Sequence, residues 1–254
     1  MAHISIRDLQ KLSAETIGAL PGPTTVKSGG RTVALLLPLK AADPDRLAAV
    51  LTRAEALAKG RDPAADDAGP RAIRRGRSGR LVGRGGARAD GRARPRMRTP
   101  SSVLVIDAAV LVAAARSRSS GAMLEAARAA ALVTTDRIVQ EARRRVELGL
   151  RRPDLLAVID ALAAELTIVP VAALPPLLAS SEVALRDAVP SRNGSTRDAP
   201  GNANVLALAW SVEADVWTTD RDFARAGIAS WSAPNLMRAL AEGALDRRST
   251  PGSE

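Results

Sequence analysis

Cysteine is absent from this 254-residue sequence, and histidine occurs only once, as His3. The chain can therefore form neither disulfides nor thiolate metal sites, and a single histidine excludes a histidine-cluster zinc site. Aromatic residues make up only 2% of the chain, so the core must be aliphatic. No run of about 18 or more apolar residues and no signal-peptide pattern occur, so we expect a cytoplasmic protein without a membrane span. We expect any catalysis to use carboxylates, hydroxyls, lysine or arginine.

The formal net charge of +10 comes from one segment. Residues 71–98 hold 11 arginines and a single acid, Asp90. Removing them from the chain totals of 37 basic and 27 acidic residues leaves 26 of each, so the rest of the chain is neutral. Residues 69–100 are rich in Gly, Arg, Ala and Pro without periodicity, and we expect a disordered linker there because such a composition cannot bury a core. The segment is a tether, a nucleic-acid-binding tail, or a stretch translated in a shifted frame before Met97.

Two short apolar runs end on carboxylates. Residues 103–106 precede Asp107, and residues 216–219 precede Asp220. Short apolar runs are typical of strands buried on both faces of a parallel sheet, and ligands bind beyond the carboxyl ends of such strands. Because paired carboxylates repel one another and hard divalent ions take oxygen ligands, the pattern predicts a Mg²⁺ or Mn²⁺ site. The alternative is that each aspartate only caps the helix after it.

From residue 103 onward, predicted strands alternate with predicted helices. Strands are expected at 103–107, 132–135, 166–169, 215–219 and 227–229. Helices are expected at 108–116, 120–131, 137–148, 153–165, 181–188, 203–213 and 235–244. This alternation predicts an α/β domain over residues 101–246, with a parallel sheet covered by helices on both faces.

Four stretches of this region carry a resemblance: VLVIDAAVLVAAA, TTDRIVQEARRR, NANVLALAWSVEAD and VWTTDRDF. Their order and spacing resemble those of the PIN-domain ribonucleases, in particular the VapC-type toxins, over residues 103–243. The resemblance implies an endoribonuclease that cleaves tRNA, rRNA or mRNA by a water activated by Mg²⁺ or Mn²⁺. By their places in the motifs, the catalytic and metal-binding acids would be Asp107, Glu141 and Asp220, with Asp222 as an accessory metal ligand.

The third acidic position of the family pattern falls on Asn202 in this chain. Asparagine offers a carbonyl oxygen without charge, and Asp198, four residues upstream, is the candidate replacement metal ligand. Glu141 has an alternative as an exposed partner of Arg145 one helical turn later. Thr218 either positions the phosphate or is a structural strand residue. The alternative function is therefore a weakened or inactive PIN-like protein that acts as a toxin–antitoxin transcriptional regulator or an RNA-binding module.

Residues 1–68 have a different organisation. A strand at 4–6 and a helix at 7–18 precede a hairpin with strands at 24–27 and 32–37, and a helix follows at 45–59. The hairpin prediction depends on Ser28-Gly29-Gly30-Arg31, which reads as a turn. A module of this size buries little apolar surface, so we expect it to be stabilised by dimerisation.

Three stretches of this segment resemble the Phd/YefM (prevent-host-death) antitoxins: ISIRDLQKLSAETI, PGPTTVKSGGRTVALLLPLK and ADPDRLAAVLTRAEALAKGRDPAADDA. The resemblance implies a small α+β module that forms a homodimer and binds operator DNA, with contact candidates Arg7, Lys11, Lys27 and Arg31. An ordinary solvated face is the alternative for each, since residues 1–70 carry only 9 basic residues against 8 acidic ones. The whole sequence is interpreted as an antitoxin-like segment fused to a PIN-like ribonuclease.

Overall fold

The C-terminal part of the chain folds around a five-stranded sheet. The computed structural model describes residues 3–59, 98–188, 199–220, 223 and 226–249. Along the sheet the strands are β6 (Thr167–Val169), β5 (Ala131–Thr135), β4 (Val103–Ile106), β7 (Asp215–Trp217) and β8 (Ser230–Trp231). Every neighbouring pair is parallel, as the alternation of strands and helices predicts. The carboxyl ends of β4 and β7 therefore meet at one edge of the sheet.

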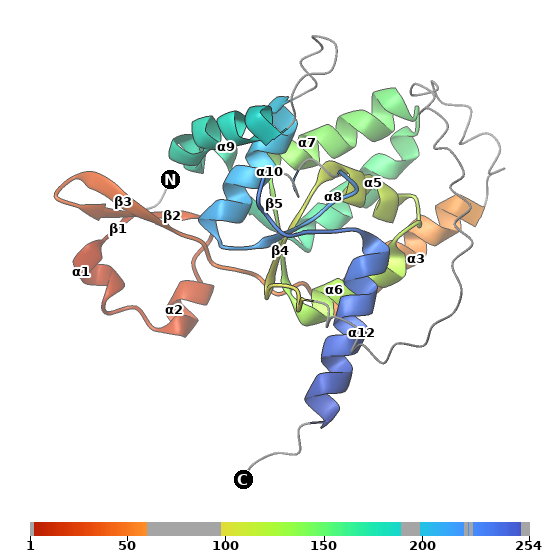
Figure 1. Cartoon of the computed structure of the whole chain (residues 1–254), viewed down its shortest axis with the longest axis horizontal. Coiled ribbons are helices and arrows are strands. Elements are labelled where there is room, and N and C mark those ends of the chain that lie inside the picture. The colour runs from red at the N-terminus through yellow and green to blue at the C-terminus, as the bar shows by residue number, and fades with distance from the viewer. Residues whose placement is uncertain (1–2, 60–97, 189–198, 221–222, 224–225, 250–254) are drawn as a thin grey trace, which may run out of the picture.

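Helices flank this sheet (Figure 1). They are α5 (Ala108–Ala115), α6 (Ser120–Ala129), α7 (Asp136–Arg144), α8 (Leu156–Ala164), α9 (Pro175–Ala188), α10 (Ala199–Ser211) and α12 (Ala233–Ser249). Three short helical turns connect them: η1 (Arg145–Gly149), η2 (Pro153–Leu155) and η3 (Val171–Ala173). The strands between these layers are buried on both faces, which explains why their sequences are continuous apolar runs rather than alternating ones. None of the helices in the described ranges combines the length and apolar character needed to cross a bilayer.

The structure moves several predicted boundaries: the helix predicted at 203–213 lies at Ala199–Ser211, and the one predicted at 235–244 lies at Ala233–Ser249. Two further shifts have a clear physical reason. The fifth strand lies at Ser230–Trp231 instead of 227–229, because Gly227 adopts a left-handed backbone with φ of 78° and belongs to a turn. The helix predicted at 181–188 begins at Pro175, where proline costs no hydrogen bond because the first turn of a helix lacks amide partners.

The N-terminal region forms a separate three-stranded sheet. Its strands are β1 (His3–Ser5), β2 (Thr24–Ser28) and β3 (Arg31–Leu36), in that order. β1 is parallel to β2, and β2 forms the predicted hairpin with β3. The continuous helix predicted at 7–18 is wrong: the chain forms α1 (Ile6–Leu9) and α2 (Ala14–Gly18) instead. The break occurs because the Ser13 hydroxyl accepts the amide hydrogen of Thr16 and starts a new helix.

The helix α3 (Pro44–Lys59) packs on the C-terminal domain rather than on the N-terminal sheet. It lies against α5, α6 and α8, and Leu47, Leu51 and Ala54 are at most 2% exposed within the same continuous core. The preceding segment is also attached, because the Lys40 amide donates to Thr167 Oγ1 at 2.9 Å. Residues 40–59 therefore complete the C-terminal core. The predicted boundary at residue 68 and most of the predicted linker lie outside the described residues.

Candidate active site

Asp107 stands at the junction of β4 and α5. Its carboxylate accepts hydrogen bonds from the amides of Ala109 and Val110, the latter at 3.3 Å, so it caps α5 as the alternative interpretation expects. Its Oδ2 atom takes no part in capping and accepts a hydrogen bond from the Thr218 hydroxyl. The same aspartate therefore caps a helix and faces the end of the neighbouring strand.

Thr218 joins the two predicted aspartates. It follows β7, which pairs with β4 in a register that sets Ile106 beside Trp217, so Thr218 comes next to Asp107. Its buried hydroxyl donates to Asp107 Oδ2 and accepts the amide hydrogen of Asp220 at 2.9 Å. This one hydroxyl links the ends of two strands that lie 111 residues apart in the chain.

Burial dominates the electrostatics of Asp107. The side chain is buried, and burial raises the pKa of its carboxyl above the ordinary value. Hydrogen bonds from Thr218 and from the amides of Ala109 and Val110 oppose that rise, and the positive charge of Arg145 adds a smaller opposing effect. The carboxylate is therefore held by fixed donors in a place where its charge is poorly solvated.

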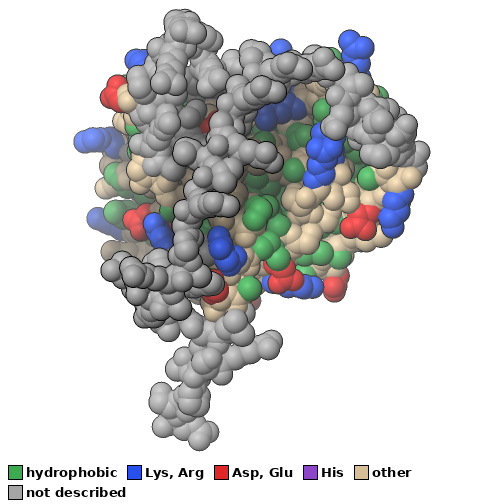
Figure 2. All heavy atoms as spheres, turned by 45° about the vertical axis from the view of Figure 1, so that its right-hand side comes forward, with side chains coloured by type: hydrophobic (Ala, Val, Ile, Leu, Met, Phe, Trp, Pro, Cys, Tyr) green, Lys and Arg blue, Asp and Glu red, His purple; other side chains and the backbone are tan. Residues whose placement is uncertain are grey.

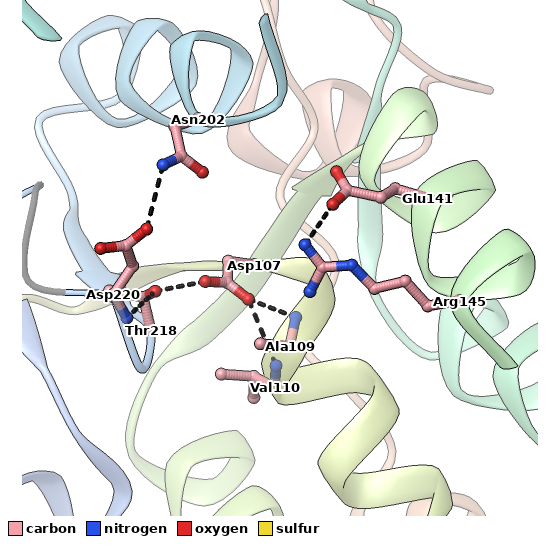
Figure 3. A network of polar contacts seen from close by, with 8 residues as sticks. All are labelled: Asp107, Ala109, Val110, Glu141, Arg145, Asn202, Thr218 and Asp220. Carbon is pink, nitrogen blue, oxygen red and sulfur yellow. Dashed lines mark hydrogen bonds and ion pairs between the residues drawn. The ribbon is translucent and has the colours of Figure 1, made fainter. Parts of the chain in front are cut away.

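Asn202, at the expected third position, lies beside Asp220. Its Nδ2 donates to Asp220 Oδ2 at 3.1 Å from the first turns of α10, and both side chains are half-buried (Figure 3). The position predicted from the motif is thus at the site, and it holds a neutral amide. The candidate ligands Asp198 and Asp222 lie outside the described residues.

Glu141 extends from α7 toward the same group of side chains. Its Oε1 forms an ion pair with Arg145 Nη2, one turn later on the same helical segment. The Glu141 side chain is 30% exposed and that of Arg145 is 50% exposed, so the pair lies at the rim of the site. In Figure 3 the guanidinium lies between Glu141 and Asp107. The alternative interpretation of Glu141 as a partner of Arg145 describes this contact correctly, and the contact lies at the site.

The four DNA-contact candidates lie on the N-terminal sheet and its helices, outside the network of Figure 3. Arg7, in α1, and Lys11, just after it, are exposed. Lys27, in β2, is half-buried, and Arg31, at the start of β3, is exposed.

The ligand atoms that the site offers are oxygens, which are the type of ligand that a hard cation prefers. Asp107, Asp220 and the Asn202 carbonyl offer oxygen ligands, and each carboxylate oxygen can accept more than one contact. Among the described residues, however, no three His, Cys, Asp or Glu side chains are grouped closely enough to hold a metal ion. The donor chemistry therefore fits Mg²⁺ or Mn²⁺, with less negative charge than a four-acid site provides.

Sequence reasoning missed two features of this geometry. It left the role of Thr218 open and did not predict its contact with Asp107, although the position of this threonine two residues before Asp220 was an available signal. It considered Arg145 only as an exposed ion-pair partner of Glu141. The spacing of these two residues along one helix does not reveal that the pair lies beside Asp107, at the end of β4 (Figure 3).

Comparison with known proteins identifies the C-terminal domain. The sequence pattern of the family described as PIN domain matches residues 105–241, a span that contains Asp107, Glu141 and Asp220. No curated protein matches the chain. Nothing found identifies residues 1–68 as a Phd/YefM antitoxin segment. Because the match covers more than half of the 254 residues, the chain belongs to the PIN domain family, a family of nucleases.

Proposed function

We propose that this chain is a metal-dependent endoribonuclease of the VapC type. The observation that carries the proposal is the buried Thr218 hydroxyl, which joins Asp107 to the amide of Asp220 at the carboxyl edge of the sheet. That edge is where parallel α/β sheets bind their ligands. The Asp107 carboxylate and the backbone of Asp220 are thereby linked at the ends of two strands, within the span that matches a nuclease family.

In this proposal Asp107, Glu141 and Asp220 hold Mg²⁺ or Mn²⁺, together with the Asn202 carbonyl oxygen. When bound, such an ion polarises a phosphate and lowers the pKa of water so that hydrolysis proceeds at neutral pH. The chain's own residues orient the ligands. Thr218 and the α5 amides fix the Asp107 carboxylate, and the Asn202 amide nitrogen fixes one oxygen of Asp220.

Besides its contact with the metal ion, Glu141 is the general base in this proposal. A base must reach the proton that it removes, either directly or through one water, and Glu141 extends toward Asp107 from the opposite helix (Figure 3). Its carboxylate is paired with Arg145, so it acts as a base only when that ion pair opens.

The test is divalent-dependent cleavage of structured RNA by the full chain and by Asp107→Asn. Asparagine keeps the cap and nearly the same volume but removes the charge, so cleavage should be lost while the circular dichroism spectrum is unchanged. The exposed Asp187→Asn, on α9, is the matched control and should cleave like the wild type. Unchanged cleavage by purified Asp107→Asn would contradict the proposal.

A second candidate is an RNA-binding or regulatory protein with a weakened or inactive PIN domain. Asn202 favours it, because the amide replaces a carboxylate and lowers the attraction for a divalent ion. RNA binding by the wild type without cleavage at any Mg²⁺ or Mn²⁺ concentration would support this candidate over the nuclease.

We also propose that the N-terminal sheet is a dimerising module that contacts operator DNA through Arg7, Lys11, Lys27 and Arg31. Support comes from exposed apolar side chains on this small sheet region, Ile6 at 45% and Val33 at 53%, which a second copy would cover. The oligomeric state by light scattering tests the dimer, with Val33→Ser expected to weaken it. A monomeric wild type at micromolar concentration would contradict it.

A further inference from the structure

Each of the three acids in the candidate active site already has a donor from the chain itself. Asp107 accepts from Thr218, and Asp220 accepts from Asn202. Glu141 differs from both because its donor, Arg145, carries a full positive charge. A cation supplied by the protein therefore occupies one part of this acidic group.

The placement of Arg145 is specific to the site. It begins η1, the π-helical turn that continues α7, and its guanidinium lies between Glu141 and Asp107 in Figure 3. The neighbouring Arg144 is exposed as well, but it forms no ion pair with an acid among the described residues.

A divalent ion that used Glu141 would meet this guanidinium. Two cations near one carboxylate repel each other, and the oxygen that Arg145 occupies is less available to a second cation.

We propose that Arg145 is an internal cation of the site that competes with the divalent metal for Glu141. The inference rests on the proposed function, since it concerns the metal of that same site. Without metal, Arg145 balances the charge of Glu141. Metal binding releases the guanidinium, and Arg145 thereby sets how much metal the protein needs.

The alternative is an ordinary surface pair. Glutamate and arginine four residues apart stabilise a helix slightly wherever they occur, with no relation to a ligand. Such a pair would affect helix stability but not metal affinity, so a metal titration distinguishes the two.

The experiment is calorimetric titration of Mn²⁺ into the full chain, with Arg145→Gln compared with the wild type. Removing one charge and one competitor close to the ligands should tighten Mn²⁺ binding by about tenfold or more. Arg144→Gln is the matched control, because it removes the same charge from the adjacent position without opening the Glu141 pair. It should change the affinity less than about twofold, since exposed charges are well screened.

A second pair of variants tests whether Glu141 is the group that is released. Glu141→Gln in the Arg145→Gln background should abolish the gain in Mn²⁺ affinity, because the freed carboxylate is gone. As an independent readout, Mn²⁺ should raise the melting temperature of Arg145→Gln at lower concentrations than it does for the wild type.

The competition is overturned if Arg145→Gln binds Mn²⁺ no more tightly than the wild type, if Arg144→Gln shows the same gain, or if neither protein binds Mn²⁺. Failure of the nuclease proposal looks different. Tighter binding by Arg145→Gln without RNA cleavage by any variant would leave the competition standing and remove the nuclease. If cleavage depends on Asp107 but Arg145→Gln binds Mn²⁺ with unchanged affinity, the nuclease proposal stands and the competition proposal fails.

Discussion

At the scale of single residues, the Thr218 hydroxyl affects both the stability of the domain and the geometry of the candidate site. It is buried between two strand ends, where it donates to a carboxylate and accepts an amide hydrogen. Leaving a buried charged group without its donor costs more free energy than an average hydrogen bond contributes. The hydroxyl therefore stabilises the domain and orients the site together.

Thr218→Val tests both roles because valine has the same shape without the hydroxyl. We expect the free energy of unfolding in urea to fall by about 1–3 kcal/mol and RNA cleavage to fall with it. Thr218→Ser keeps the hydroxyl and should recover most of both quantities. Equal stability of the valine and serine variants would show that the hydroxyl contributes nothing.

Asp107 should make the protein less stable as the pH rises, which is the opposite of the usual effect of an aspartate. Burial raises its folded-state pKa above the ordinary value of 3.8, so folding favours the protonated form. Its favourable contribution is complete below the ordinary pKa and is lost as the pH rises through the folded-state pKa. Asp107→Asn should therefore melt at a higher temperature than the wild type at pH 7, and the difference should shrink toward pH 4.

Thermal unfolding by circular dichroism between pH 4 and 8 measures this difference, with Asp187→Asn as the exposed control. A wild type more stable than Asp107→Asn at pH 7 would mean that the hydrogen bonds to Asp107 outweigh its burial.

The residues of the site divide into those that a sequence can indicate and those that it cannot. Asp107 and Asp220 follow apolar runs, and the spacing of the motif indicates Asn202, so all three could be named in advance. The partner of the Thr218 hydroxyl could not, because it depends on the register between β4 and β7. Register is a property of the assembled sheet rather than of either strand.

At the scale of helices and strands, α3 is an element that could be predicted from the sequence although its packing partner could not. Its apolar face predicts a helix, and the structure has that helix at Pro44–Lys59. An apolar stripe does not specify which surface will cover it, and resemblance assigned α3 to the N-terminal module. In the structure it packs on α5, α6 and α8.

Leu51→Ala should therefore destabilise the C-terminal domain, although the substitution lies outside the residues that match the PIN family. We expect a loss of about 2–5 kcal/mol, typical of a buried leucine truncated to alanine. All three tryptophans of the chain lie in the C-terminal part, at positions 210, 217 and 231, so their fluorescence during denaturation reports that domain alone.

Arg53→Ala is the control for this experiment, because Arg53 is an exposed residue of the same helix. An unfolding midpoint of the tryptophan signal that is the same in Leu51→Ala and the wild type would show that α3 does not contribute to this core.

At the scale of the whole molecule, the net positive charge is concentrated in one segment of the chain, residues 71–98. Residues 1–70 have 9 basic and 8 acidic residues, and residues 99–254 have 17 and 18. On the face drawn in Figure 2, described basic and acidic side chains are interspersed rather than gathered by sign. Long-range attraction to nucleic acid should therefore come mainly from the arginines of residues 71–98.

Replacing the ten arginines of residues 71–97 with serine tests this expectation without changing the length of the chain. Arg98 is kept because it pairs with Asp215 at 3.3 Å. Binding to random DNA should lose most of its salt dependence, since counterion release drives such binding. Any sequence-specific binding by residues 1–68 should persist, because base contacts carry specificity. An unchanged salt slope on random DNA would contradict the expectation.

The position of α3 also determines what a protease would leave behind. A cut between Lys59 and Arg98 divides the polypeptide but leaves Leu47, Leu51 and Ala54 within the core of the C-terminal domain. The two fragments should remain associated as a nicked protein and co-elute until denaturant separates them. Conversely, a polypeptide begun at Met97 would expose the surfaces of α5, α6 and α8 that α3 covers. Such a shortened product would need the missing helix supplied in trans to become a stable, soluble domain.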